Sequence, residues 1–186
     1  MLRRRWFWLR RARLLGAPVY VHWSVLAVAA LLVVISFKSP IHAVVALASY
    51  LGVIVIHELG HAWMARRLGY RVNAIHVAFL HGSCEYDAAY SEWDDVRIAW
   101  GGVLAQLAIA VPILIVATAL GDRDLGYAGP AVAFLGYVNL LIALVNLAPA
   151  PGLDGHKAWR VLPLFAQWWR ARTATKQTVV KLKRRR

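Results

Sequence analysis

The stretch that decides the fold is VIVIHELGHAWMARRLGY, residues 53–70. Four aliphatic residues run directly into two histidines and a glutamate, and an arginine pair follows. On insertion scales, a charged side chain at the centre of a bilayer costs about 2.5–3.5 kcal/mol. An apolar helix that carries His57, Glu58 and His61 together therefore indicates a functional site inside that helix.

The composition around this stretch is that of a membrane protein. Of the 186 residues, 60% are hydrophobic and the mean hydropathy is +0.53, whereas a soluble domain is about 45–50% apolar. We therefore predict an α-helical membrane protein with about four transmembrane helices. The length predicts a single membrane-embedded domain over residues 1–186 without room for a second sizeable domain. The predicted spans are residues 23–37, 41–65, 96–120 and 129–148.

The basic residues predict the orientation of these spans. The net charge is +13, and if the N-terminus is cytoplasmic, four crossings place 20 of the 22 Lys and Arg residues on the cytoplasmic side and only Lys38 and Arg123 outside. This is the asymmetry of the positive-inside rule. Because topology already explains the charge, nucleic-acid binding is not expected. We predict an integral protein of a bacterial inner membrane with both termini in the cytoplasm, and a retained first span rather than a cleaved signal peptide.

Three segments outside the spans have their own character. Residues 1–21 are basic and aromatic, which predicts an N-terminal segment at the membrane interface. In residues 71–95, the alternating stretch VNAIHVAF is followed by HGS and CEYDAAY, which predicts two short strands around a turn, a small β-hairpin on the cytoplasmic side. Residues 156–186 predict an interfacial helix, interrupted at Pro163, and a basic tail.

The two histidines of the opening stretch are spaced for metal binding. Positions 57 and 61 are four apart, so both imidazoles project from one face of a helix. They can occupy two corners of a tetrahedral zinc site, with Glu58 beside them as the general base. The alternative is a pair of histidines that are merely packed and hydrogen-bonded.

A third ligand is expected from the second half of the chain. Seven of the nine acidic residues fall in predicted loops, and only Glu58 and Asp154 lie in or at the edge of apolar segments. Asp154 belongs to NLAPAPGLDG, residues 146–155, where Pro149 and Pro151 break the fourth span. Broken backbone at membrane depth is tolerated where it lines a cavity inside the protein. Asp154 is therefore the candidate third zinc ligand, at the same cytoplasmic depth as the histidines.

HELGH on a transmembrane helix, followed by NLAPAPGLDG at the end of a later one, resembles the site-2 protease family of intramembrane zinc metalloproteases. The segment GAPVYVHWS before the first span is similar to bacterial members, and the resemblance covers residues 14–162. It implies one zinc ion bound by His57, His61 and Asp154, and water activated by Glu58. It also implies that Asn146 orients the substrate or the oxyanion, and that the substrates are membrane-anchored regulatory proteins.

The chain departs from the family pattern at two places. The third span reads GGVLAQ, with Gln106 near the position of a family asparagine, and LHGSCEYD replaces a glycine-rich sequence. Neither a PDZ-like nor a CBS-like regulatory domain is expected. An inactive membrane scaffold and a metal transporter are the alternative functions. The presence of Glu58 disfavours a scaffold, and the lack of further intramembrane acids disfavours a transporter.

Five further residues have chemistry to which the sequence assigns no single role. His22 is a candidate for interfacial packing or catalysis, and His76 and His81 for solvated strand positions or accessory ligands. His156, two residues after the candidate ligand, is a candidate for support of the metal site. Cys84 is the only cysteine, which excludes an internal disulfide and leaves a packed thiol or an additional ligand.

Overall fold

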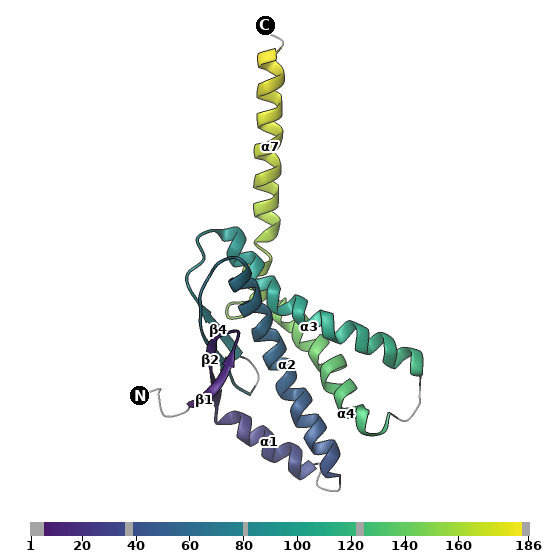
Figure 1. The fold of residues 1–186 in the computed structure, drawn as a ribbon. Coiled ribbons are helices and arrows are strands. Elements are labelled where there is room, and N and C mark those ends of the chain that lie inside the picture. The colour runs from purple at the N-terminus through teal and green to yellow at the C-terminus, as the bar shows by residue number, and fades with distance from the viewer. Residues whose placement is uncertain (1–5, 36–38, 80–81, 122–124, 184–186) are drawn as a thin grey trace.

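The computed structural model describes residues 6–35, 39–79, 82–121 and 125–183 (Figure 1). Apolar helices form the body of the molecule, and a small sheet lies beside one of them. The elements, in chain order, are β1 (Trp6–Leu14), β2 (Ala17–His22), α1 (Ser24–Ile35), α2 (Pro40–Arg67), β3 (Val72–Val77), β4 (Gly82–Tyr86), α3 (Glu92–Leu120), η2 (Gly126–Ala128), α4 (Gly129–Ala131), η3 (Val132–Val138), α5 (Asn139–Asn146), α6 (Asp154–Ala158) and α7 (Val161–Lys183).

Three helical segments within the described residues are long and apolar enough to cross a membrane: α2, α3 and the continuous run Gly126–Asn146. They match three of the four predicted spans and confirm an α-helical membrane protein. The fourth, α1, is an apolar helix of only 12 residues, shorter than the roughly 20 that a perpendicular crossing needs. Helix α1 thus covers residues 24–35 of the predicted span 23–37, and residues 36–38 lie outside the described part of the chain.

The sheet has four strands in the order β1-β2-β3-β4. The predicted hairpin is confirmed as β3 and β4, which pair antiparallel. The first two strands were not predicted: β1 and β2 form a second hairpin, and β2 pairs in parallel with β3, with Val19 opposite Ile75. Ile75, Val19 and Ala17 are buried with Ile54 of α2, so one face of the sheet packs against that helix.

Helices α2 and α3 cross at a pair of glycines. A Cβ added to Gly60 would collide with the backbone of Gly101, and a Cβ on Gly101 would meet the backbone oxygen of Gly60 at 2.6 Å. Two residues without side chains therefore let the helix backbones approach closely, as at small-residue contacts in other membrane proteins. Gly60 lies between His57 and His61 and directly precedes the second, so this crossing determines how far α3 stands from them.

Local sequence signals set the ends of both helices. Pro40 occupies the first turn of α2, where its missing N–H has no helical partner to lose. The helix ends before Gly69, which has φ +91° and turns the chain toward β3. Ser91 caps α3, because its side chain accepts a hydrogen bond of 3.1 Å from the backbone N–H of Asp94.

The C-terminal part differs from the predicted interrupted helix. Helix α7 runs from Val161 through Pro163 and projects away from the helical body (Figure 1). The expected interruption at Pro163 is wrong, because this proline is the third residue of the helix, where a missing N–H breaks no intrahelical bond. The interfacial location of residues 156–186, like that of residues 1–21, stays a prediction.

Candidate metal centre

The two histidines of α2 face the same point in space. Their Nε2 atoms lie 3.1 Å apart, and the rings meet edge to face with centroids 4.6 Å apart. His61 is buried and His57 is nearly so. The two rings meet because residues four apart in a helix project from one face.

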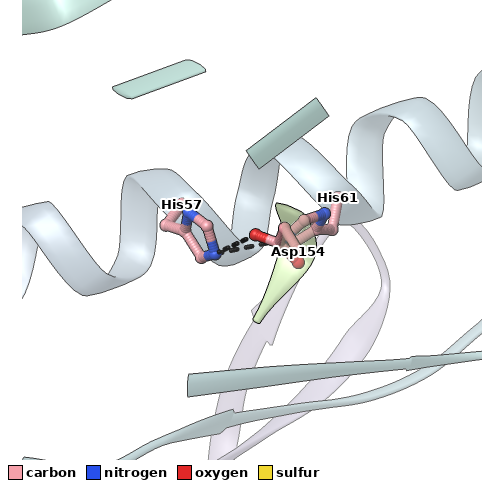
Figure 2. Close-up of side chains that lie close together, drawn as sticks. All are labelled: His57, His61 and Asp154. Carbon is pink, nitrogen blue, oxygen red and sulfur yellow. Dashed lines mark hydrogen bonds and ion pairs between the residues drawn. The ribbon is translucent and has the colours of Figure 1, made fainter. Parts of the chain in front are cut away.

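Asp154 reaches the same point from the second half of the chain. Helix α5 ends at Asn146, the two prolines of residues 147–153 prevent its continuation, and Asp154 begins α6. The Asp154 carboxylate oxygen Oδ2 lies 3.0 Å from Nε2 of His57 and 3.2 Å from Nε2 of His61 (Figure 2). Among the described residues, only these three offer a group of His, Cys, Asp or Glu ligand atoms so close together.

The hydrogen bonds behind the rings fix which nitrogen faces this point. The Nδ1 atom of His61 lies 2.7 Å from the carbonyl oxygen of Ile98, which can only accept, so Nδ1 carries the proton. In the same way, Nδ1 of His57 donates to Oε1 of Gln106 at 2.9 Å. The Nε2 atoms of both rings therefore face the Asp154 carboxylate, and the neutral form of each ring directs a lone pair at it.

This arrangement fits a divalent metal ion. Two lone pairs and a carboxylate oxygen that face one another repel, unless a cation lies among them. Ligand atoms at 2.0–2.1 Å from a tetrahedral zinc lie about 3.3 Å from each other. The three observed separations of 3.0–3.2 Å are close to that value. Two imidazoles and a carboxylate also form a common ligand set of catalytic zinc, which leaves a fourth position open.

Glu58 lies beside the three ligands and is shielded from solvent. Its side chain is 2% exposed, and Oε2 has no hydrogen-bond partner within the described ranges. The first residue of β4, Gly82, packs directly on it, because an added Cβ there would lie 2.5 Å from Oε1. The absence of a side chain at position 82 therefore allows the strand to come this close to the carboxylate.

A cavity of about 600 Å³ opens onto this group. Its walls come from α2, from β4 and from the segment between α5 and α6, and include Glu58, Gly82, Ser83, Asn146 and Gly152. Asn146, the last residue of α5, has its Nδ2 atom 3.3 Å from Nε2 of His57. The cavity therefore places a polar amide, a carboxylate and the three candidate ligands around one space.

Gln106, to which the sequence assigns no role, lies behind His57 in the structure. Gln106 is fully buried on α3, and its backbone oxygen accepts a hydrogen bond of 3.1 Å from Nδ2 of Asn139. Asn139 is equally buried and follows the π-helical segment Val132–Val138. The signal available in the sequence is a polar residue in an apolar span, which by itself indicates only a departure from the family pattern. The structure shows that the glutamine orients the His57 ring.

The remaining candidate residues that the structure describes do not join the three converging ligands. His76 pairs with Glu85 at 3.1 Å in the sheet, and His22 hydrogen-bonds Ser24 at 2.8 Å. His156 is exposed at the rim of the cavity. Cys84 also lines the cavity, where burial raises the pKa of its thiol to about 12, and its sulfur is not among the ligand atoms that converge. His81 lies outside the described residues.

The substitution Gly102→Ala should weaken metal binding strongly. An added Cβ at Gly102 of α3 would lie 2.5 Å from Nε2 of His61 and 2.8 Å from Cε1 of His57, so both rings must shift. Alanine favours a helix more than glycine does, so the substitution should not destabilise α3 itself, and a loss of zinc affinity would come from the displaced rings. We expect zinc affinity to fall about tenfold or more, measured by competition with a chelator. Gly129→Ala, where the new methyl group meets nothing within 4 Å, is the control. Equal zinc affinity in both variants would contradict this packing.

Comparisons with known proteins agree with this geometry. The chain is 27% identical over 156 residues to a zinc metalloprotease of Methanocaldococcus jannaschii, across 83% of this chain and 45% of that protein. It is 31% identical over 171 residues to Rip3 of Mycobacterium tuberculosis, by its name a candidate zinc metalloprotease, across 80% of this chain and 42% of that protein. The chain thus spans less than half the length of these two curated relatives. No protein-family profile matches it.

A solved structure shares the fold. The site-2 protease from Methanocaldococcus jannaschii superposes with a TM-score of 0.67 at 23% sequence identity. The match covers 84% of this chain and 71% of that one.

Proposed function

Because the chain belongs to the site-2 protease family, we propose that it is an intramembrane zinc metalloprotease that cleaves membrane-anchored regulatory proteins in or near their transmembrane segments. One observation carries this proposal: the Nε2 atoms of His57 and His61 and Oδ2 of Asp154 converge within 3.2 Å, beside the buried carboxylate of Glu58. A scaffold has no use for such a carboxylate, and no feature of the described residues favours that alternative or a transporter.

The proposed roles follow from the positions of the side chains. His57, His61 and Asp154 would hold the zinc ion, which when bound supplies a Lewis acid that polarises a carbonyl and lowers the pKa of water to about 7. Glu58 takes a proton from the attacking water at its carboxylate and delivers it to the leaving amine. The Asn146 amide lies at the edge of the same space, where its N–H can orient the substrate carbonyl.

Strand β4 is suited to present an unwound substrate to these groups. It is the last strand of the sheet, so its outer edge has no neighbouring strand among the described residues. Residues Gly82, Ser83, Cys84 and Tyr86 of this strand also line the catalytic cavity. A peptide that adds to an open edge pairs through its backbone and becomes extended. This matters because the carbonyls of a helical substrate are engaged in hydrogen bonds.

The proposed location is the inner membrane of a bacterium, with both termini in the cytoplasm. Strand β2 directly precedes α1, and β3 directly follows α2. Because β2 and β3 are paired, the start of α1 and the end of α2 lie on the same side of the membrane in this proposal. The side chain of Arg66, at the end of α2, also hydrogen-bonds the Leu15 carbonyl between β1 and β2. Lys157 and Arg160 contact the first turn of α3 on this same side. The positive-inside rule assigns this basic side to the cytoplasm.

Reporter fusions test this orientation. A green fluorescent protein joined after Arg186 should fluoresce, and alkaline phosphatase at the same position should be inactive, because the first works only in the cytoplasm and the second only outside. The matched control is a fusion after Gly121, between the second and third long apolar helices, where the opposite pattern is expected. Active phosphatase after Arg186 would contradict the proposed topology.

Cleavage itself is tested by co-expression. The chain is produced in bacteria together with single-span membrane proteins that carry tags at both ends, and the intact and shortened forms are followed on blots. The proposed protease produces a shortened form in the membrane fraction. If no substrate in a broad panel is shortened, although the protein is folded and contains zinc, the data favour the scaffold.

A further inference from the structure

The third candidate ligand is carried by an element that is too short to hold itself in place. Helix α6 contains only five residues, Asp154–Ala158, and follows an irregular segment of seven residues. Isolated helices of this length are unstable, so contacts with the rest of the molecule must fix the position of α6. The position of Asp154 must be accurate, because its Oδ2 atom approaches two imidazoles at once.

The contacts that fix α6 come from the first turns of α3. The ammonium group of Lys157 lies 3.0 Å from Oδ1 of Asp95, and the indole N–H of Trp100 donates to the Ala158 carbonyl at 3.2 Å. Lys157 stands three residues after Asp154, so it anchors the helix within one turn of the ligand. Burial alone would lower the pKa of Lys157, but the hydrogen bond to Asp95 raises it, so the ammonium stays charged.

Asp95 also connects this anchor to the strand that lines the cavity. The Tyr86 hydroxyl of β4 donates to the same oxygen, Oδ1 of Asp95, at 3.4 Å. Tyr86 and Lys157 both line the catalytic cavity. One carboxylate oxygen on α3 therefore contacts the element that carries the candidate ligand and the strand at the cavity wall.

We propose that Asp95 and Lys157 are positioning residues that hold Asp154 at the metal site. The inference rests on the proposed zinc protease function and adds two residues outside the ligand set. Without the Asp95–Lys157 pair, α6 loses its charged link to α3 but keeps the Trp100 hydrogen bond and the packing of Gly155 and Ala158, so Asp154 is held less accurately against the imidazoles. Groups that orient metal ligands in this way typically change metal affinity about 10–100-fold when removed.

Zinc retention tests this proposal without reference to cleavage. Lys157→Met keeps the aliphatic stem and removes the charge, and the side chain of Lys157 is 48% exposed, so the fold should tolerate the change. We expect this variant and Asp95→Asn to lose zinc to a chelator about tenfold faster than the wild type. The double variant should be no worse than the worse single one, because both changes remove one interaction. Lys157→Arg, which keeps the charge, should retain zinc like the wild type.

A second ion pair on α3 provides the control. Arg97 lies 3.4 Å from Asp94, and its side chain is 57% exposed, so Arg97→Met should leave zinc retention unchanged. The metal-free Lys157→Met protein should unfold at the same temperature as the metal-free wild type, which distinguishes positioning from a general loss of stability. Wild-type zinc retention in both Lys157→Met and Asp95→Asn would overturn this inference alone. A wild-type protein that binds no zinc would overturn the proposed function and this inference together.

Discussion

Replacement of Glu58 by glutamine is expected to abolish measurable cleavage while zinc stays bound. The amide has almost the shape of the carboxylate but cannot accept a proton at neutral pH. A general base typically contributes about 100-fold to 10,000-fold to a rate, and we expect a loss of at least this size. The measurement is the rate at which a tagged membrane substrate is shortened by purified protein in lipid vesicles.

The surroundings of Glu58 indicate that the fold survives this change. The carboxylate is 2% exposed and packs on Gly82, so a nearly isosteric amide fills the same space. Removal of a buried charge also removes an unfavourable desolvation. The Glu58→Gln protein should therefore bind substrate without releasing product and accumulate as a complex that can be captured by cross-linking.

Two results would contradict the assigned role. Cleavage at the wild-type rate would show that another group takes the proton. Loss of zinc to the same extent as in a ligand variant would show that Glu58 is itself a ligand, and the site would then have been misassigned. Glu85→Gln is the matched control, since this glutamate is largely exposed in the neighbouring strand and should leave cleavage unchanged.

The outline of the site could be predicted from the sequence because its parts carry strong local signals. His57, Glu58 and His61 lie within five residues of one helix, so helical spacing alone places them together. Asp154 could be found by elimination, since the chain has nine acidic residues and only two are at apolar segments. Its proline-rich neighbourhood also predicted the end of a helix, and α5 does end at Asn146.

Features that depend on distant pairing could not be predicted in the same way. Strands β1 and β2 lie in a basic, aromatic segment whose composition also suits a membrane interface, and the partner of β2 is more than 50 residues away. The close approach of Gly102 to the imidazoles depends on the angle at which α2 and α3 cross. Gln106 became interpretable only once this crossing placed its amide against His57.

The substitution His57→Ala should remove almost all bound zinc and, with it, cleavage. The wild type is expected to hold about one zinc per chain, because three protein ligands and one open position complete a catalytic site. After the change only His61 and Asp154 remain, and Gln106 loses the hydrogen-bond partner of its Oε1 atom. Metal analysis of purified protein measures the loss. Asp154→Ala should weaken retention less severely, because both imidazoles stay in place on α2.

Thermal unfolding with and without a chelator separates loss of metal from loss of fold. A ligand that binds only the folded state raises the unfolding temperature, so a chelator should lower that temperature in the wild type. It should have no such effect on His57→Ala, which has little zinc to lose. His156→Ala is the matched control, because this exposed histidine lies at the rim of the same cavity and is not among the three converging ligands. It should retain zinc and respond to the chelator like the wild type. If His57→Ala binds zinc as the wild type does, the converging imidazoles are packed side chains and the metal lies elsewhere.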